Sequence, residues 1–287
     1  MIDGLLDHMS LFSPLGSRQR ATLAAAVIAT PSFAAGQKLL RSADKPTSVQ
    51  FLLSGTACRY SLLPNGQCQI TALLLPGDPI GFESLVQRSC VDTVSALTLT
   101  QSAQIPARVI ATWLACRSPV SEMLWRITQL QTAITREWVV NVGKRPALER
   151  MAHFFCETVT RSRALGISTA SGCNLPLTQA ELATIVAITP VHVNRVLMQL
   201  KRENLVSLSR GYLRILDLPA LQALAGFDPA YLAPLHPTER QEHDFQTLQH
   251  SDNERLRAMG RASCAALRAP PACGGPFPHP RDPNQRR

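Results

Sequence analysis

The stretch from residue 182 to residue 202 contains no acidic residue, and His192, Asn194 and Arg195 lie in its middle. All three side chains can donate hydrogen bonds, and an arginine can donate two parallel bonds to a guanine. Donors of this kind can meet phosphates and base edges together at the beginning of a helix, whose free backbone N–H groups also favour anions. These residue types therefore indicate DNA chemistry, provided that one exposed helix face carries them.

Two predicted helices provide that face. Thr178 and Glu181 form a Ser/Thr-x-x-Glu capping box that begins a short helix. After a turn at Ile188, Thr189 is a suitable N-cap and Pro190 a suitable first residue for the second helix. Apolar residues recur at helical spacing along the second helix and predict its buried stripe: Val193, Val196, Leu197 and Leu200.

A β-hairpin is predicted directly after the second helix. Residues 206–208 and 212–216 alternate between apolar and polar on either side of Ser209-Arg210-Gly211. Helix, tight turn, helix and hairpin is the order of a winged helix-turn-helix, so sequence-specific DNA binding is the leading hypothesis. Two packed helices and a hairpin also occur in small domains that do not bind DNA, and this alternative stays open.

The predicted DNA contacts follow from the arrangement of these elements. Arg195 is the main candidate for base recognition, because of its bidentate geometry. His192 and Asn194 are further candidates to face the bases. Phosphate contacts position a protein without reading the sequence, and the candidates for them are Gln179, Thr189 and Arg210.

Composition and charge agree with this hypothesis. The chain has 287 residues, of which 45% are hydrophobic, and this is enough material for two globular domains. The formal net charge is +9, and the excess is densest in residues 143–225, which carry ten basic and five acidic side chains. A basic segment suits a polyanionic partner. No apolar run could span a bilayer, and Asp3 and Asp7 stand where a signal peptide would be positive, so a cytoplasmic protein is expected.

Other kinds of chemistry are not supported by motifs. The cysteines, at positions 58, 68, 90, 116, 156, 173, 264 and 273, include no Cys-x-x-Cys pair and predict neither a disulfide framework nor a metal site. The chain contains no Gly-x-Ser-x-Gly elbow, Walker loop, His-Glu-x-x-His or dinucleotide fingerprint. We therefore do not expect an enzyme.

The first half of the chain changes from helical to β-rich at Phe33. Residues 1–29 read as helical. Short apolar runs follow at residues 49–53, 58–63, 68–75 and 91–105, and Gly, Pro, Asn and Asp separate them. Short strands at regular spacing predict a β-sandwich or barrel, in which Asn65-Gly66 is a good hairpin turn. Residues 106–116 predict a short helix.

Three glycines in this part, Gly55, Gly66 and Gly77, are spaced eleven residues apart. The segments Phe51-Leu52-Leu53-Ser54-Gly55, Pro64-Asn65-Gly66 and Leu75-Pro76-Gly77-Asp78-Pro79-Ile80-Gly81 resemble the β-roll of cyclic-nucleotide-binding domains. Together with the winged helix-turn-helix, residues 1–225 resemble the Crp/Fnr family of bacterial transcription regulators. The resemblance implies an α+β fold: an N-terminal antiparallel β-roll, a long dimerisation helix and a C-terminal winged helix-turn-helix.

The implied domains are a β-roll sensor-like domain at residues 1–118, a dimerisation helix at 119–142 and the DNA-binding domain at 143–225. An apolar stripe near coiled-coil spacing predicts the dimer contact: Val120, Leu124, Ile127, Leu130, Ile134 and Trp138. A helix that merely covers the β-roll would explain the same stripe. Residues 141–144 read as a hinge, after which Pro146 opens a helix with Arg161 near its C-terminal end, where a cation suits the helix dipole. Residues 226–287 predict a disordered or weakly helical tail without an assigned function.

The resemblance also allows the effector site to be compared. In family members that bind cyclic AMP, a Gly-Glu pair opens the phosphate-binding segment, and an Arg about a dozen residues later meets the phosphate. Here the pair is Gly81-Phe82, with Glu83 one position late, and Thr93 falls near the Arg position. Without that Arg a phosphate loses its strongest charge-assisted bonds, so cyclic nucleotide binding is not expected. The candidate effector residues are Gly81, Phe82, Glu83, Ser84, Arg88 and Thr93. The first cysteine is Cys58, so the N-terminal iron–sulfur cluster of the Fnr branch is not expected.

The function implied by the resemblance is a regulator that binds a palindromic operator in double-stranded DNA as a homodimer, with RNA polymerase as a further partner. The resemblance also places Pro190 and Val191 at base-reading positions. The alternative is a small-molecule sensor whose β-roll regulates a partner protein through a protein-docking winged helix. Ionic strength separates the two hypotheses, because phosphate contacts make DNA affinity fall steeply with salt.

Overall fold

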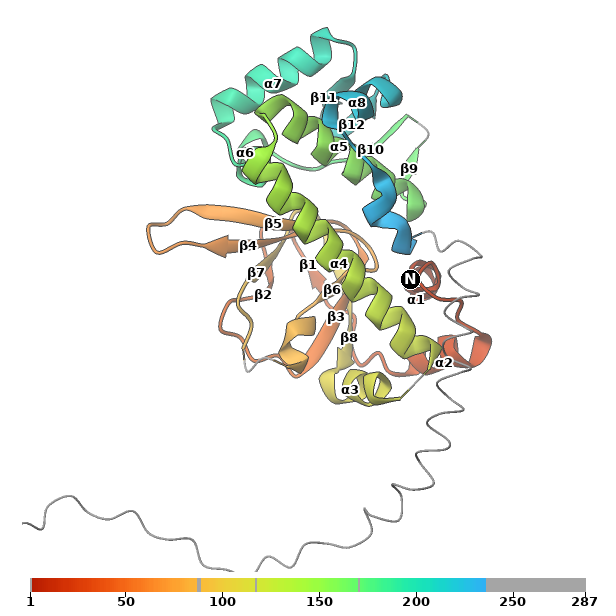
Figure 1. Ribbon diagram of the computed structural model, residues 1–287. Helices are drawn as coiled ribbons and strands as arrows, with labels where there is room; N and C mark the ends of the chain where they lie inside the picture. Colours follow the sequence, from red (N-terminus) through yellow and green to blue (C-terminus); the bar gives the residue numbers. More distant parts are fainter. Residues whose placement is uncertain (1, 87–88, 117, 170, 236–287) are drawn as a thin grey trace, which may run out of the picture. The chain divides into compact units, whose positions relative to one another are not determined.

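The N-terminal part of the chain folds as a β-roll of two four-stranded antiparallel sheets (Figure 1). The computed structural model describes residues 2–86, 89–116, 118–169 and 171–235. One sheet has the order β1-β8-β3-β6 and the other β2-β7-β4-β5. The strands are β1 Ser32–Phe33, β2 Lys38–Leu40, β3 Ser48–Ser54, β4 Ala57–Leu62, β5 Cys68–Leu74, β6 Pro79–Ile80, β7 Thr93–Ala96 and β8 Thr100–Pro106.

The predicted strands are confirmed, with one subdivision. Residues 91–105, expected as one apolar run, form β7 and β8, which belong to different sheets. The predicted turn at Asn65-Gly66 is confirmed, with Gly66 at φ 82° and its N–H donating to the Leu63 carbonyl at 2.9 Å. Gly55 has a second, steric reason to be glycine, because its φ is 84° and a Cβ there would meet the Leu99 carbonyl.

Along the chain, helices precede and follow the strands of the β-roll. The predicted N-terminal helical region is α1 Ile2–Ser10 and α2 Ser17–Ala25, separated by a break that contains Pro14 and Gly16. A short 3-10 helix, η1 Phe82–Leu85, follows β6, and α3 Ala107–Ala115 follows β8 as predicted. The long helix α4 spans Pro119–Lys144 and begins with a capping box between Ser118 and Ser121.

The apolar stripe of α4 is buried within the protomer and does not form the predicted dimer contact. Its residues are at most 7% exposed: Val120, Leu124, Ile127, Leu130, Ile134 and Trp138. They join the main hydrophobic core together with α1, the β-roll and the helix that follows α4. The alternative explanation is the correct one for these six residues, because periodicity shows that a helix face is covered but not which partner covers it.

The break between α4 and the following helix lies later than predicted. Residues 141–144 are helical, and the extended residue is Arg145, at φ −73° and ψ 139°. Pro146 then precedes α5 Ala147–Ala164. A residue before proline disfavours the helical conformation, which explains why α4 ends here. The boundary at 142/143 therefore moves to Arg145.

The winged helix-turn-helix follows α5. Its helices are α6 Gln179–Val186, α7 Pro190–Arg202 and α8 Leu218–Ala225, and its sheet has the order β11-β12-β10-β9. The predicted hairpin is confirmed as β11 Val206–Ser209 and β12 Tyr212–Ile215. Two further strands, β9 Ser168–Thr169 and β10 Gly172–Asn174, extend this sheet and were not predicted.

Folded structure continues beyond the predicted start of the tail at residue 226. A 3-10 helix, η2 Pro229–Leu235, follows α8, and Phe227 and Leu232 are buried at 8% and 1% exposure. The rest of the predicted tail, residues 236–287, lies outside the described residues. Within the described part of the chain, no helix is both long and apolar enough to cross a membrane.

Candidate nucleic-acid interface

Helix α6 begins with the predicted capping box. Glu181 Oε2 accepts hydrogen bonds from Thr178 N at 2.7 Å and Thr178 Oγ1 at 2.8 Å, while Glu181 N donates to Thr178 Oγ1 at 3.2 Å. Gln179, predicted to contact phosphate, is the first residue of this helix and is exposed. The capping box thus fixes the direction in which α6 starts.

The turn between α6 and α7 is tight and is held from α5. Ala187 adopts the left-handed conformation at φ 51°, and Thr189 caps α7 by accepting from His192 N at 3.3 Å. Arg150 of α5 donates to the Val186 and Ala187 carbonyls at 2.5 and 3.3 Å. Sequence reasoning missed Arg150, because its carbonyl partners lie 36 and 37 residues away and backbone acceptors leave no sequence signal.

Helix α7 has the two faces predicted from its sequence. Val193, Val196 and Leu200 are at most 4% exposed and pack into the core, with Leu197 partly buried beside them. The residues predicted to read DNA are all exposed on the other face: Pro190, Val191, His192, Asn194 and Arg195. Helix α7 contains no acidic residue, and no other helix or strand among the described residues covers its first turns (Figure 1). The exposed face of α7 can therefore donate hydrogen bonds to base edges in a groove of DNA.

Arg210 lies at the turn of the hairpin, apart from α7. Both turn residues have positive φ, 49° at Arg210 and 72° at Gly211. The Gly211 carbonyl accepts from Leu175 N at 2.7 Å, which ties the hairpin turn to the segment that leads into α6. Arg210 also lines a cavity of about 560 Å³ beside Gly55 and Pro76 of the β-roll. The phosphate contact at Arg210 stays a prediction.

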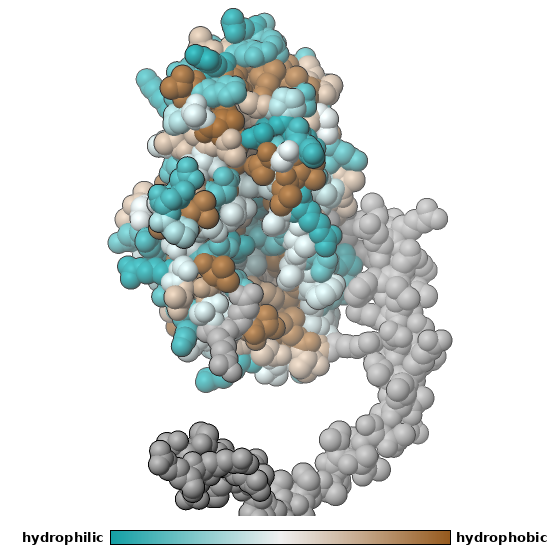
Figure 2. Space-filling model, turned by 60° about the vertical axis from the view of Figure 1, so that its left-hand side comes forward, coloured by the Kyte–Doolittle hydropathy of each residue, from teal (hydrophilic) through white to brown (hydrophobic). Residues whose placement is uncertain are grey.

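The positive charge of this domain is concentrated on solvent-facing residues. Lys201 and Arg202 at the end of α7, and Arg214 in β12, are exposed in addition to Arg195 and Arg210. On the face shown in Figure 2, hydrophilic residues surround several separate hydrophobic patches. A polar, cationic surface of this kind is the normal composition of a DNA interface.

The candidate effector residues are only partly brought together. Phe82 and Glu83 line an apolar cavity of about 620 Å³ between η1 and α4, which Arg59, Trp125 and Arg136 also line. The Ser84 hydroxyl is engaged, since it donates to the Gly81 carbonyl at 2.6 Å.

Thr93 starts β7, where its hydroxyl oxygen accepts from Ser42 N at 3.2 Å, and it does not line this cavity. Arg88 lies outside the described residues. The two arginines of the cavity, Arg59 and Arg136, come from β4 and α4, and no motif marked them in the sequence.

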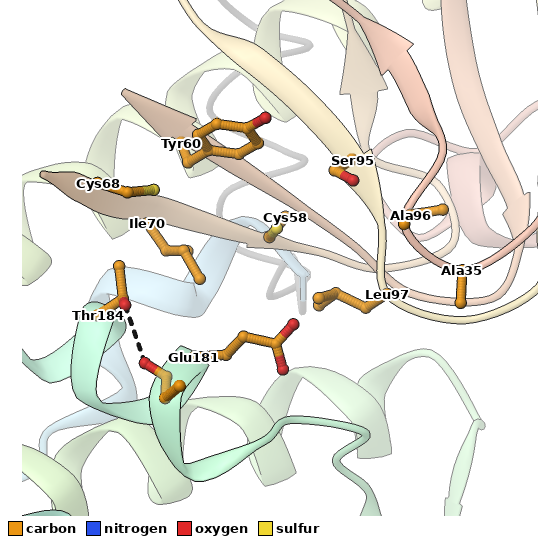
Figure 3. Close-up of a pocket in the computed structure, with 12 residues that line it drawn as sticks. Ala35, Cys58, Tyr60, Cys68, Ile70, Ser95, Ala96, Leu97, Glu181 and Thr184 are labelled. Carbon is orange, nitrogen blue, oxygen red and sulfur yellow. Dashed lines mark hydrogen bonds between the residues drawn. The ribbon is translucent and has the colours of Figure 1, made fainter. Parts of the chain in front are cut away.

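A second cavity, of about 380 Å³, lies where the β4–β5 hairpin meets α6 (Figure 3). Cys58, Tyr60, Cys68 and Ile70 line it from the hairpin, and Glu181 lies opposite. Burial raises the pKa of the Cys58 thiol to about 12, so this thiol is protonated and inert at neutral pH. Over the described residues, no group of three or more His, Cys, Asp or Glu could hold a metal ion.

Two family models match successive parts of the chain. Residues 30–115 match the cyclic nucleotide-binding domain, and residues 149–224 match the Crp-like helix-turn-helix domain. The nitrogen fixation regulation protein FixK of Bradyrhizobium diazoefficiens is 29% identical over 199 residues, covering 67% of this chain and 80% of that protein. The anaerobic regulatory protein of Haemophilus influenzae is 26% identical over 190 residues, covering 66% and 74%.

Solved structures share the same fold. FixK2 from Bradyrhizobium japonicum has a TM-score of 0.63 at 21% identity and covers 70% of this chain and 98% of its own. A CRP-family transcriptional regulator from Thermus thermophilus has a TM-score of 0.57 at 21% identity, with coverage of 69% and 97%.

A β-roll of the cyclic-nucleotide-binding type followed by a winged helix-turn-helix defines a DNA-binding transcription regulator, a class of proteins that are not enzymes. The chain belongs to the Crp/Fnr family.

Proposed function

We propose that the protein regulates transcription as a homodimer, in which each protomer reads one half-site of a palindromic operator with the N-terminal part of α7. The observation that carries this proposal is the exposed, acid-free start of α7, with His192, Asn194 and Arg195 on its free face. Arg195 would donate to a guanine, and Val191 would contact a thymine methyl group. The protein would act in the cytoplasm, with RNA polymerase as a partner at the promoter.

The exposed face of α4 supports the dimer. Trp125 and Val139 are 59% and 65% exposed, and Thr132 lies between them, so the three residues follow a seven-residue spacing. Large apolar side chains exposed along one helix face are typical of an interface. This face, which lies opposite the buried stripe, is the one available to a second α4.

The dimer is tested with Val139→Glu, which places a charge in the proposed contact. Leu62→Glu is the matched control, because Leu62 is also exposed, at 67%, but lies at the tip of the β4–β5 hairpin. We expect sedimentation velocity to show a dimer for the wild type and Leu62→Glu and a monomer for Val139→Glu. A dimer that survives Val139→Glu would contradict this interface.

DNA reading is tested by selection from a random duplex pool with the wild type and Arg195→Ala. We expect an enriched palindrome, and the variant should lose about 1–3 kcal/mol and relax its preference at one position of each half-site. Arg108→Ala, an exposed arginine of α3, is the matched control and should select the wild-type sequence. An unchanged preference in Arg195→Ala would refute the role of Arg195.

Salt dependence separates DNA reading from the protein-docking alternative. If two protomers neutralise several phosphates, the binding constant for the selected duplex falls linearly with salt concentration on logarithmic axes. A winged helix that only docks on a protein would enrich no duplex in the selection, so no DNA affinity would fall as the salt concentration rises.

We further propose that any effector is not a cyclic nucleotide and that no iron–sulfur cluster is involved. Phe82 stands where cyclic-AMP-binding relatives are expected to have a glutamate, and Thr93 lies away from the η1–α4 cavity. The described cysteines are scattered between Cys58 and Cys173, and none precedes the β-roll. Calorimetric titration with cyclic AMP and cyclic GMP should give no binding heat. Saturable binding of either nucleotide would overturn the first part of the proposal.

A further inference from the structure

Three ionisable side chains are buried together where α5 meets the β-roll. Arg161 of α5 is 4% exposed, Glu157 one turn before it is 1% exposed, and Asp78 of the β5–β6 turn is 7% exposed. Arg161 Nη2 lies 2.7 Å from Asp78 Oδ2, and Arg161 Nη1 lies 3.8 Å from Glu157 Oε1. Arg161 Nη1 also donates to the Leu73 carbonyl at the end of β5, at 3.1 Å.

Each carboxylate of this cluster is held by a second segment of the chain. Asp78 Oδ1 accepts from Gln131 Nε2 of α4 at 2.8 Å. Glu157 accepts from Trp138 Nε1 of α4, at 3.0 and 3.1 Å to its two oxygens. The β5–β6 turn, α4 and α5 therefore meet at one set of hydrogen bonds, and the chain between α4 and α5 consists of Arg145 and Pro146.

A fourth segment completes the cluster. The C-terminal strap, which we define as residues 226–235, follows the last residue that matches the helix-turn-helix family model, residue 224. Tyr231 of the strap donates its hydroxyl proton to Glu157 Oε2 at 2.8 Å. Phe227 and Tyr231 both contact the ring of His153 in α5, with ring centroids 5.1 and 6.1 Å apart. The strap thus packs on α5, and its Tyr231 donates to Glu157, the same residue that accepts a hydrogen bond from Trp138 of α4.

Such a cluster is better suited to fixing an orientation than to adding stability. A buried ion pair contributes little net stability compared with apolar residues, because both charges lose their hydration. Removing one partner, however, leaves an unpaired buried charge, so placements of the segments that separate the partners are penalised. The DNA-reading face of α7 is exposed in this placement.

We propose that Arg161, Glu157, Asp78 and Tyr231 are positioning residues that hold the winged helix domain in its DNA-reading orientation without a bound effector. The strap supplies a contact that lies outside the residues matching the family models. DNA binding by this protein then needs no ligand-driven rearrangement at Arg145. The inference rests on the proposed function for its consequence in DNA reading, but the orientation itself can be tested without DNA.

The first experiment measures protection of the hinge by limited tryptic digestion of the full chain. Trypsin can cleave after Lys144, which is exposed at the end of α4, and cleavage after Arg108 in α3 serves as the internal reference for general unfolding. The test variants are Asp78→Asn and Tyr231→Phe. Asp7→Asn is the matched control, since Asp7 pairs with Arg20 at 2.6 Å on the surface.

We expect cleavage after Lys144 to accelerate about tenfold relative to cleavage after Arg108 in both test variants, because Asp78→Asn weakens the pair with Arg161 and Tyr231→Phe loses a buried hydrogen bond to Glu157. Asp7→Asn should digest like the wild type. If Asp78→Asn fails to fold, the smaller change in Tyr231→Phe decides the matter. An unchanged Lys144-to-Arg108 ratio in folded Tyr231→Phe would overturn the proposal.

The second experiment measures how strictly the half-site spacing is read. Operators from the selection are lengthened or shortened by one base pair at the centre. The wild type and Asp7→Asn should discriminate against these operators, whereas Tyr231→Phe should bind all of them with similar affinity and keep the same half-site sequence. Undiminished discrimination in Tyr231→Phe would count against the positioning role. Failure of the wild type to bind any duplex would refute the proposed function and leave the digestion result standing.

Discussion

The sharpest prediction on pH dependence concerns His153, which is 1% exposed in α5. Burial, followed by the charge of Arg145, lowers the pKa of this histidine from 6.5 to about 4, although Glu137 opposes the shift. The His153 Nε2 atom lies 3.2 Å from Glu137 Oε1, but neither ring nitrogen makes an aligned hydrogen bond. The rings of Phe227 and Tyr231 cover the imidazole. His153 is therefore neutral in the folded protein at pH 7.

The lowered pKa makes folding sensitive to mild acid. Above pH 6.5 the histidine is neutral in the folded and unfolded chain, and its contribution to stability is fully present. As the pH falls from 6.5 towards 4, the unfolded chain gains a proton that the folded chain does not, so the contribution is lost. For a pKa of about 4 in the fold, the loss between about pH 7.5 and pH 5 is about 2 kcal/mol.

The assay is urea unfolding of the wild type and His153→Gln at about pH 7.5 and about pH 5. Carboxylates also titrate in acid, but they do so in both proteins and cancel in the comparison. The wild type should lose about 2 kcal/mol more of its unfolding free energy than the variant between the two pH values. A difference of about 0.5 kcal/mol or less would show that His153 keeps an ordinary pKa in the fold and that the reasoning from burial fails.

Three further outcomes are expected. Thr178→Ala removes the N-cap of α6 and should lower the unfolding free energy by about 1 kcal/mol in urea titrations, while Thr184→Ala, in the same helix, should cost less. Gly55→Ala places a Cβ against the Leu99 carbonyl at positive φ, and should lower the unfolding free energy by about 1–3 kcal/mol, whereas a neutral effect would contradict the close approach. Iodoacetamide at neutral pH should spare Cys58, because burial raises its thiol pKa to about 12; rapid labelling in the folded state would contradict this.

Local features of the fold were predictable because their causes lie within a few residues. The capping box of Thr178 and Glu181, the N-cap Thr189 followed by Pro190, and the turn at Asn65-Gly66 each depend on neighbouring backbone groups. The two faces of α7 were predictable for the same reason, since a helix repeats about every 3.6 residues. The DNA contacts of that face stay predictions, because exposure shows which side chains are available and not what they bind.

Features that depend on distant partners were not predictable. Arg161 has the position of a cation that favours a helix C-terminus, yet its partner is Asp78, 83 residues earlier. The predicted tail contains many prolines, yet Phe227 and Leu232 at its start are buried. Side chains that pair across the fold leave no periodic signal, so only the structure assigns them.

The stripe on α4 shows how a correct pattern led to a wrong contact. A helix with apolar residues on one face needs one partner, but a helix with large apolar residues on two faces needs two. Trp138 belongs to the face that the protomer covers, whereas Trp125 and Val139 belong to the face that it leaves exposed.

If the exposed face pairs with a second α4, the dimer carries two copies of α7, and a two-fold axis makes them read a palindrome in major grooves about one helical turn apart. The same pairing doubles the phosphate contacts of each complex. A protein confined to the monomer by Val139→Glu should therefore bind an isolated half-site with about half the salt dependence that the wild type shows on the palindrome.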